Sequence, residues 1–283
     1  MLKLIECPRD AMQGWHRLIS TEEKADYLNA LLKVGFDTID FGSFVSPKAI
    51  PQMADTRDIL PRLQLGDTRS KLLAIVANLR GAEEAVAFDE ISYLGFPFSI
   101  SETFQLRNTN KTIAESLEQV YAMQELCIKN RKELVIYISM GFGNPYGDAY
   151  SPEIALRWVE EMVKMEIGII SLADTVGVAE PATIKALFKH LIPAYPQVEI
   201  GAHFHAAPYN WEEKVLAAYE QGCKRFDSTI KGIGGCPMAK DELVGNLATE
   251  NLIAFCQAQQ EPLTLDMNAL YTAQQLANTV FKD

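Results

Sequence analysis

Several features are scarce in this 283-residue chain, and each shortage excludes a class of protein. No apolar run reaches the roughly 18 residues of a membrane-spanning helix, so we expect no transmembrane segment and no membrane partner. Positive charge is low, with 26 Lys and Arg against 37 Asp and Glu and no basic block, which argues against nucleic-acid binding. No GxGxxG or Walker motif follows the first predicted strand, so a dinucleotide-binding open sheet is not favoured.

Cysteine is also sparse and scattered. The five cysteines are odd in number and form no CxxC pair, which argues against a disulfide framework and against a zinc ribbon. No signal-type apolar segment or Arg-rich transit segment is recognisable at the N-terminus. We therefore expect a cytoplasmic protein with reduced thiols.

What the chain has is an alternation of short β-branched runs with longer amphipathic stretches. The runs predict eight strands, at residues 3–7, 38–41, 72–76, 90–93, 134–139, 167–172, 198–203 and 225–228. The stretches between them predict helices, among them 21–34, 113–130, 151–165, 181–194 and 210–221. Eight such units favour an α/β fold of the TIM (β/α)8 barrel type, as a single domain over residues 1–283, with an additional C-terminal helix at about 265–281 packed on the barrel.

The unusual polar residues follow the predicted strands, at the end where barrel enzymes place their active sites. They are Arg9 and Asp10 after strand one, Asp40 in strand two, Asp174 after strand six, His203 and His205 at strand seven, and Cys236 and Asn246 after strand eight. This distribution predicts one site at the carboxyl ends of the strands.

The two histidines of His203-Phe204-His205 are the first candidate metal ligands. Alternation along a strand sends both imidazoles to the same face of the sheet, where they either pack in the protein or hold an ion. With the carboxylate of Asp10 the set suits zinc, iron, manganese or cobalt. An amide oxygen from Asn246 makes the set harder and shifts the preference towards Mg²⁺ or Mn²⁺.

The other candidates each allow two interpretations. Arg9 beside Asp10 fits an ordinary salt-bridged turn, or a guanidinium that stabilises a developing oxyanion. Cys236 stands in a glycine-rich loop at residues 232–237, which fits a simple turn or a thiol acting as acid, base or nucleophile. Asp40 and Asp174 fit helix caps as well as catalytic carboxylates.

Together these segments resemble the 3-hydroxy-3-methylglutaryl-CoA lyases of the DRE-TIM metallolyase superfamily, over almost the whole chain. The segments that carry the resemblance are 7–13 (CPRDAMQ), 43–48 (SFVSPK), 51–53 (PQM), 101–104 (SETF) with Asn108 and Asn110, 170–177 (ISLADTVG), 203–205 (HFH), 232–237 (GIGGCP) and 245–250 (GNLATE). The SFVSPK and GGCP strings are more specific to the lyases than the HFH string, which the wider superfamily shares.

The resemblance implies a lyase that cleaves 3-hydroxy-3-methylglutaryl-CoA, or a close hydroxyacyl-CoA, into acetyl-CoA and acetoacetate, as in leucine degradation. By the resemblance, Asp10, His203, His205 and Asn246 would hold a divalent cation, Mg²⁺ or Mn²⁺, with Zn²⁺ or Co²⁺ as substitutes in a crystal. Catalytic roles would fall to Arg9, Asp40, Asp174, His203 and Cys236, and substrate contacts to Gln13, Ser43, Ser171 and Thr175. Barrels of this type also often form homodimers.

Four positions depart from the pattern of the resemblance. They are Ala11 for a glycine, Asp40 for a glutamate, Ala206 for the aspartate after the second histidine, and Val135 for an arginine on strand five. The departures leave the acyl substrate open. Two alternatives therefore stand beside the lyase: another aldolase or acyl-CoA condensing enzyme of the superfamily, and a barrel that binds metal or CoA without turnover. The cysteine loop favours an enzyme, because binding alone needs no thiol there.

Overall fold

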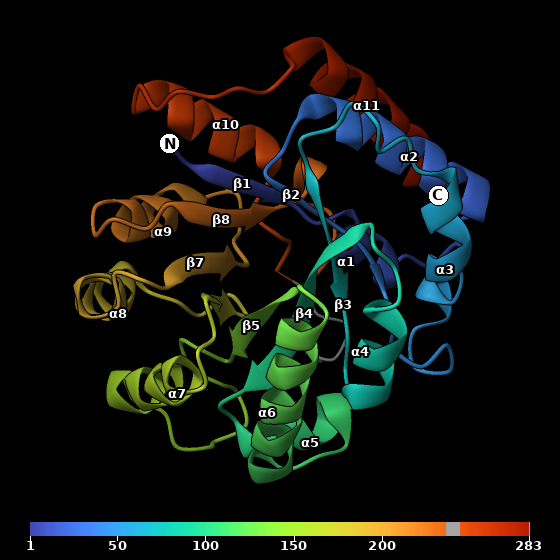
Figure 1. The fold of residues 1–283 in the computed structure, drawn as a ribbon. Coiled ribbons are helices and arrows are strands. Elements are labelled where there is room, and N and C mark those ends of the chain that lie inside the picture. Colours follow the sequence, from blue (N-terminus) through green and yellow to red (C-terminus); the bar gives the residue numbers. More distant parts are fainter. Residues whose placement is uncertain (236–243, 283) are drawn as a thin grey trace.

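Eight parallel strands form a closed barrel in which neighbouring strands follow the order of the chain (Figure 1). The computed structural model describes residues 1–235 and 244–282. Its strands are β1 (Lys3–Glu6), β2 (Thr38–Ser43), β3 (Lys71–Ile75), β4 (Ile91–Ser99), β5 (Glu133–Ser139), β6 (Ile169–Asp174), β7 (Glu199–Phe204) and β8 (Arg225–Ser228). The predicted TIM barrel is confirmed, and each predicted strand overlaps an observed one.

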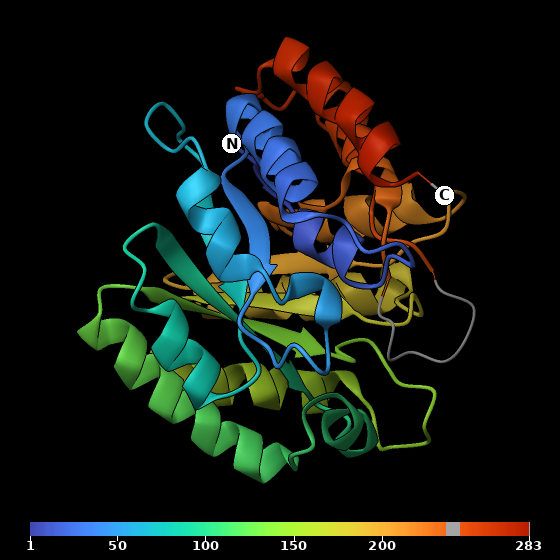
Figure 2. The same cartoon turned by 90° about the vertical axis from the view of Figure 1, so that its right-hand side faces the viewer.

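Helices cover the outside of the barrel (Figure 1, Figure 2). They are α1 (Pro8–Gln13), α2 (Thr21–Val34), α3 (Thr56–Ile59), α4 (Leu79–Ala85), α5 (Glu102–Thr109), α6 (Ile113–Lys129), α7 (Pro152–Lys164), α8 (Pro181–Ala194), α9 (Trp211–Tyr219), α10 (Thr249–Ala258) and α11 (Met267–Val280). A large apolar core fills the space between this ring of helices and the strands.

Local sequence sets both ends of α2. The Ser20 hydroxyl accepts a hydrogen bond from the Glu23 amide, and the Glu23 carboxylate accepts one from the Ser20 amide. Gly35 ends the helix at φ 82°, the left-handed conformation that glycine adopts without strain. Helix α11 lies along α2, and the Asp266 amide before it donates to the Val34 carbonyl (Figure 2). The C-terminal helix thus packs on the outside of the barrel.

The barrel interior is apolar towards β3–β6 and charged towards β7 and β8. The apolar cluster consists of Leu73, Ile75, Tyr93, Val135, Tyr137 and Ile169. Opposite it, Arg225 and Asp227 of β8 are both buried. Gly201 makes room for the arginine, because a Cβ at that position would lie only 2.9 Å from Arg225 Cδ. Buried charges therefore lie below the carboxyl ends of β7 and β8.

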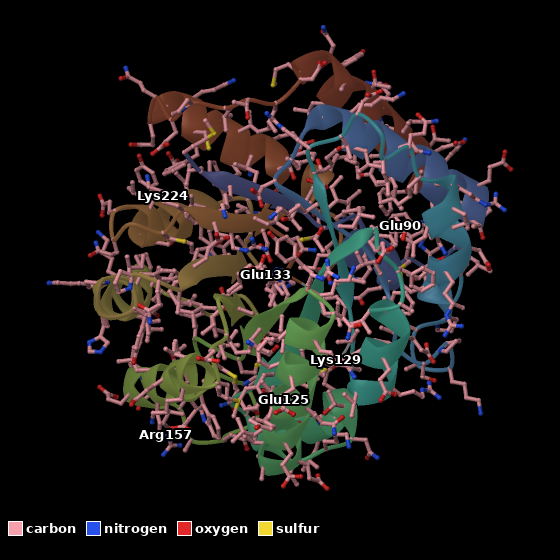
Figure 3. The ribbon with its side chains drawn as sticks, in the orientation of Figure 1. Glu90, Glu125, Lys129, Glu133, Arg157 and Lys224 are labelled. Atoms are coloured by element: carbon pink, nitrogen blue, oxygen red, sulfur yellow. The ribbon has the colours of Figure 1, made fainter. Side chains whose placement is uncertain are left out.

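The opposite end of the barrel, where the strands begin, carries exposed charges. Glu90, Glu133 and Lys224 are exposed and lie at or next to the first residues of β4, β5 and β8 (Figure 3). This end is a solvated face, and the polar residues of the predicted site lie at the other end. In residues 1–235 and 244–282, no helix combines the length and apolar character that crossing a membrane requires.

Glu6 is a buried carboxyl group on the outer face of the barrel wall. Its carboxyl oxygens accept hydrogen bonds from the Ile230 amide at 2.9 Å and from the Thr249 hydroxyl at 2.5 Å. It therefore joins β1 to the residues that follow β8 and to the start of α10. Burial raises the pKa of Glu6 to about 8 against these hydrogen bonds.

A Glu6→Gln substitution should flatten the pH dependence of stability. The pKa of Glu6 rises from 4.5 in the unfolded chain to about 8 in the fold. The stability that the protonated Glu6 contributes is therefore fully present below pH 4.5 and is lost as the pH rises through about 8. Urea unfolding across this window should show the wild type losing a few kcal/mol relative to the variant, at up to about 1.4 kcal/mol per pH unit. Equal pH slopes for the two proteins would contradict the assignment.

Candidate active site

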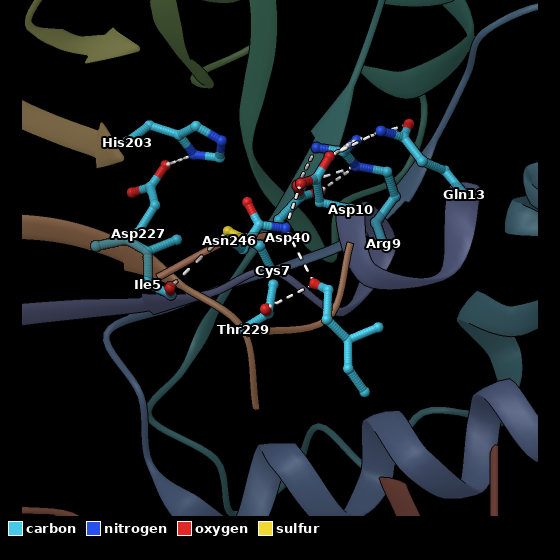
Figure 4. A network of polar contacts seen from close by, with 11 residues as sticks. Ile5, Cys7, Arg9, Asp10, Gln13, Asp40, His203, Asp227, Thr229 and Asn246 are labelled. Atoms are coloured by element: carbon cyan, nitrogen blue, oxygen red, sulfur yellow. Dashed lines mark hydrogen bonds and ion pairs between the residues drawn. The ribbon is translucent and has the colours of Figure 1, made fainter. Parts of the chain in front are cut away.

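Helix α1 places three polar side chains of the predicted site next to one another. It begins directly after β1, with Pro8 at its first position, where a missing amide hydrogen costs nothing. The Arg9 guanidinium donates from Nη1 to Asp10 Oδ1 at 2.9 Å and to Gln13 Oε1 at 2.9 Å. The Gln13 amide in turn donates to Asp10 Oδ1 at 2.7 Å (Figure 4).

Arg9 is fixed from its other side by Asp40 of β2. Its Nε donates to both oxygens of Asp40, at 3.2 and 3.0 Å, and Nη2 lies 2.5 Å from Asp40 Oδ2. Burial raises the pKa of Asp40 to about 6, although Arg9 acts to lower it. Burial alone would lower the pKa of Arg9, but Asp40 and Asp10 raise it, so the guanidinium stays charged. These contacts fix the Arg9 guanidinium, a permanent positive charge, in the lining of the site.

Asp10, His203 and His205 form a group that can hold a metal ion. One ligand atom from each lies within 4.8 Å of the others. His203 Nδ1 is 3.0 Å from Asp227 Oδ2, and His205 Nδ1 is 3.1 Å from the Val244 carbonyl oxygen. Both hydrogen bonds use Nδ1, so Nε2 of each ring is the nitrogen that can bind an ion.

Asn246 joins this group from the segment before α10. Its Nδ2 donates to Asp10 Oδ2 at 2.7 Å and to the Ile233 carbonyl at 3.0 Å (Figure 4). An isolated antiparallel bridge between His205 and Asn246 brings the two residues together. With its nitrogen directed at these acceptors, the side-chain oxygen of Asn246 is the atom that can bind a cation.

The charge states of Asp10 and His205 favour the binding of a cation. Burial would raise the pKa of Asp10, but Arg9 and the two imidazoles hold it below its ordinary value, so the carboxylate is charged. Burial, and then the neighbouring His203, lower the pKa of His205, which keeps that ring neutral and able to bind metal. Burial also acts to lower the pKa of His203, but the Asp227 carboxylate raises it.

A second group of similar size consists of Cys7, His203 and Asp227, whose ligand atoms also lie within 4.8 Å. Burial raises the pKa of the Cys7 thiol well above its ordinary value, with Asp227, Asp40 and Asp10 adding to the shift. Because a metal binds the thiolate, the first group is the better cation site.

A cavity of about 450 Å³ opens over these residues. Its polar end is formed by Arg9, Asp10, Gln13, Asp40, His203 and His205. Its apolar wall includes Val45, Ile50, Ile75, Pro97, Phe104 and Tyr137. Arg107, Asn108, Thr109, Ser139 and Thr175 also line the cavity, so it combines charged and polar groups with apolar surface, as ligand sites for small molecules do.

The remaining predicted residues lie in different surroundings. Thr175 lines the cavity, and its hydroxyl accepts from the Met140 amide at 2.9 Å. Ser43 is buried, and its hydroxyl accepts from the Val45 amide at 3.3 Å. Ser171 is buried, and its hydroxyl has no protein partner in the described part of the chain. Asp174 is buried and paired with Lys214 at 2.7 Å. Cys236 lies outside the described residues.

Three side chains near the site were not singled out from the sequence. Asp227 lies on the inward face of β8 with Arg225. Its register opposite His203 is the feature that could have indicated its place in the site. Tyr137 lines the cavity, with its ring centroid 5.7 Å from that of His203. Lys214 gave no signal, because a lysine on an amphipathic helix is ordinarily exposed.

Comparisons with known proteins agree with these features. The HMGL-like family model matches residues 3–277. A 3-hydroxy-3-isohexenylglutaryl-CoA/hydroxy-methylglutaryl-CoA lyase of Pseudomonas aeruginosa is 32% identical over 97% of this chain and 91% of its own length. An (R)-citramalyl-CoA lyase of Chloroflexus aurantiacus is 30% identical over 94% of this chain and 86% of its own length. The chain spans 58% of the mitochondrial hydroxymethylglutaryl-CoA lyase of Arabidopsis thaliana, at 29% identity over 96% of this chain.

A solved structure of an HMG-CoA lyase has the same fold as this chain. The HMG-CoA lyase of Acinetobacter baumannii, in complex with coenzyme A and 3-methylmalate, superposes with a TM-score of 0.91 at 32% identity. The match covers 99% of this chain and 91% of that chain. The chain therefore belongs to the HMGL-like family and is a carbon–carbon lyase.

Proposed function

We propose that this protein cleaves 3-hydroxy-3-methylglutaryl-CoA, or a close hydroxyacyl-CoA, into acetyl-CoA and a β-keto acid. The observation that carries the proposal is the placement of Asp10, His203 and His205 within 4.8 Å of one another, with Arg9 at the same end of the cavity. Retro-Claisen cleavage needs a group that polarises the substrate and a cation that meets the enolate charge. The HMGL-like family supplies the expectation of a thioester substrate.

The residues present fit a divalent cation. Asp10, His203, His205 and Asn246 would hold it, and the oxygen donors among them favour Mg²⁺ or Mn²⁺, while the imidazoles also accept Zn²⁺ or Co²⁺. When bound, the ion would polarise the substrate hydroxyl and lower its pKa.

The side chains would divide the remaining work. Arg9, fixed between Asp10 and Asp40, would stabilise the charge that moves onto the thioester oxygen as the carbon–carbon bond breaks. His203 or Asp174 would take the hydroxyl proton. Of these two, His203 lines the cavity. Its Nδ1 is engaged by Asp227, so it could take the proton only at Nε2, while that nitrogen does not hold the ion. A proton delivered from Cys236 to the enolate carbon completes the proposal.

The proposal leaves the acyl group of the substrate open, so a panel of hydroxyacyl-CoA thioesters tests it. The relatives named above are lyases of a methyl-branched, an isohexenyl-branched and a citramalyl thioester. We expect acetyl-CoA release in the presence of Mn²⁺, with the highest kcat/KM for 3-hydroxy-3-methylglutaryl-CoA. Pyruvate release from CoA-free hydroxy keto acids, without acetyl-CoA from any thioester, would instead identify an aldolase. Metal-dependent thermal stabilisation without any product would identify a binding protein.

The setting of the reaction also belongs to the proposal. We propose a role in leucine degradation and a cytoplasmic location, supported by four buried free cysteines in the described part of the chain. A rat relative at 32% identity is described as cytoplasmic, whereas the mouse relative at 32% is described as mitochondrial. A homodimer is proposed on the resemblance alone.

A further inference from the structure

Lys214 is a buried lysine directed towards the site from the outer ring of helices. It lies on α9, and its side chain is only 1% exposed. Lysine is almost never fully buried unless it is paired, so the interior position needs partners.

Three acceptors satisfy the Lys214 ammonium group. Nζ lies 2.7 Å from Asp174 Oδ2, 3.0 Å from the Gly177 carbonyl and 3.0 Å from the His205 carbonyl. A lysine ammonium has three donors, so all of them are used. The partners belong to the end of β6, the turn after it, and the residue after β7 that is a candidate metal ligand.

Asp174 uses both of its carboxylate oxygens within this arrangement. Oδ1 accepts from the Ala179 amide at 3.0 Å, and Oδ2 accepts from Lys214. Its neighbours Ala173 and Thr175 line the cavity, whereas Asp174 does not belong to the lining. Alternation along β6 explains this, because consecutive side chains point to opposite faces of the strand.

We propose that Lys214 is a positioning residue for His205 and that Asp174 is its counter-ion, not the base of the reaction. The ammonium group holds the main chain of His205 while the Val244 carbonyl holds its ring. The pair would thereby support the main chain next to Ala206, where the resemblance implies an aspartate. The claim that Asp174 is not the base rests on the proposed function. The claim that Lys214 positions His205 for metal binding does not.

A double-mutant comparison tests this inference. Lys214→Met removes the donor to the His205 carbonyl, so Mn²⁺ affinity, measured by electron paramagnetic resonance of free Mn²⁺, should fall about 10- to 100-fold. Asp174→Asn with Lys214→Met leaves neither charge unpaired and should fold more stably than Lys214→Met, but it still lacks the donor to His205, so its Mn²⁺ affinity should stay low. At saturating Mn²⁺ the double variant should turn over within about tenfold of the wild type, because Asp174 is not the base. Lys189→Met, at an exposed lysine of α8, is the matched control.

Two results would overturn the inference. Wild-type Mn²⁺ affinity in a folded Lys214→Met protein would show that Lys214 does not position the metal site. A double variant about 100-fold or more slower than the wild type at saturating Mn²⁺ would return Asp174 to the chemistry. If Lys214→Met does not fold, the double variant and Asp174→Asn still decide between these roles. If the wild type cleaves no hydroxyacyl thioester, the Mn²⁺ measurements still test Lys214 while the proposed function fails.

Discussion

Replacement of His205 by alanine is expected to lower Mn²⁺ affinity at least about 100-fold, more than the loss of an outer hydrogen-bond partner causes. The ring is buried, its Nδ1 is engaged by the Val244 carbonyl, and one of its nitrogens lies within 4.8 Å of the ligand atoms of Asp10 and His203. Turnover should fall about 1,000-fold, because metal stabilisation of charge contributes several kcal/mol and about 1.4 kcal/mol is tenfold in rate. Isothermal titration with Mn²⁺ and steady-state kinetics measure the two effects.

His190→Ala provides the matched control for this variant. His190 is an exposed histidine on α8, away from the candidate ligands. It should bind Mn²⁺ and turn over as the wild type does. If His205→Ala bound Mn²⁺ equally well, the ion would have to be held elsewhere.

The second large effect is expected at Arg9. Arg9→Lys should lower kcat about 100- to 1,000-fold at saturating Mn²⁺, the loss typical of one removed oxyanion donor. A lysine cannot reproduce the planar fork that contacts Asp40 through Nε and Nη2 while Nη1 contacts Asp10 and Gln13. Single-turnover kinetics with excess enzyme would assign the loss to the chemical step.

Arg157→Lys is the control for the arginine substitution, because Arg157 is exposed on α7 (Figure 3). It should leave kcat unchanged. A kcat close to wild type in Arg9→Lys would mean that a positive point charge is sufficient and that the fork has no role.

Hydrophobic periodicity predicted the barrel well because each strand is a short apolar run bounded by a helix. The largest discrepancy is β4, which was expected to end at residue 93 and continues to Ser99. Gly95 and Pro97 made the second half look unlike a strand. In the barrel Gly95 is required by close packing, since a Cβ there would lie 2.6 Å from Ile75 Cδ1. Such a contact between strands cannot be read from one segment.

The candidate site was predictable where topology alone brings residues together. Asp10 and Asn246 are 236 positions apart, yet their side chains meet because both follow strands that neighbour each other in the closed barrel. Lys214 could not be predicted, because its buried position depends on pairing with the Asp174 carboxylate, 40 positions earlier in the chain at the end of β6. Helix α1 was also missed, since six residues after a strand carry too little periodicity to indicate a helix.

The central claim is metal-dependent cleavage of a hydroxyacyl thioester, and one rate measurement tests it most directly. The wild-type protein is stripped with EDTA, and acetyl-CoA release from 3-hydroxy-3-methylglutaryl-CoA is followed before and after addition of Mn²⁺ or Mg²⁺. The arrangement of Asp10, His203 and His205 predicts little acetyl-CoA without the ion and a rate at least about 100-fold higher with it. Equal rates with and without the ion, or no acetyl-CoA with either ion, would contradict the account.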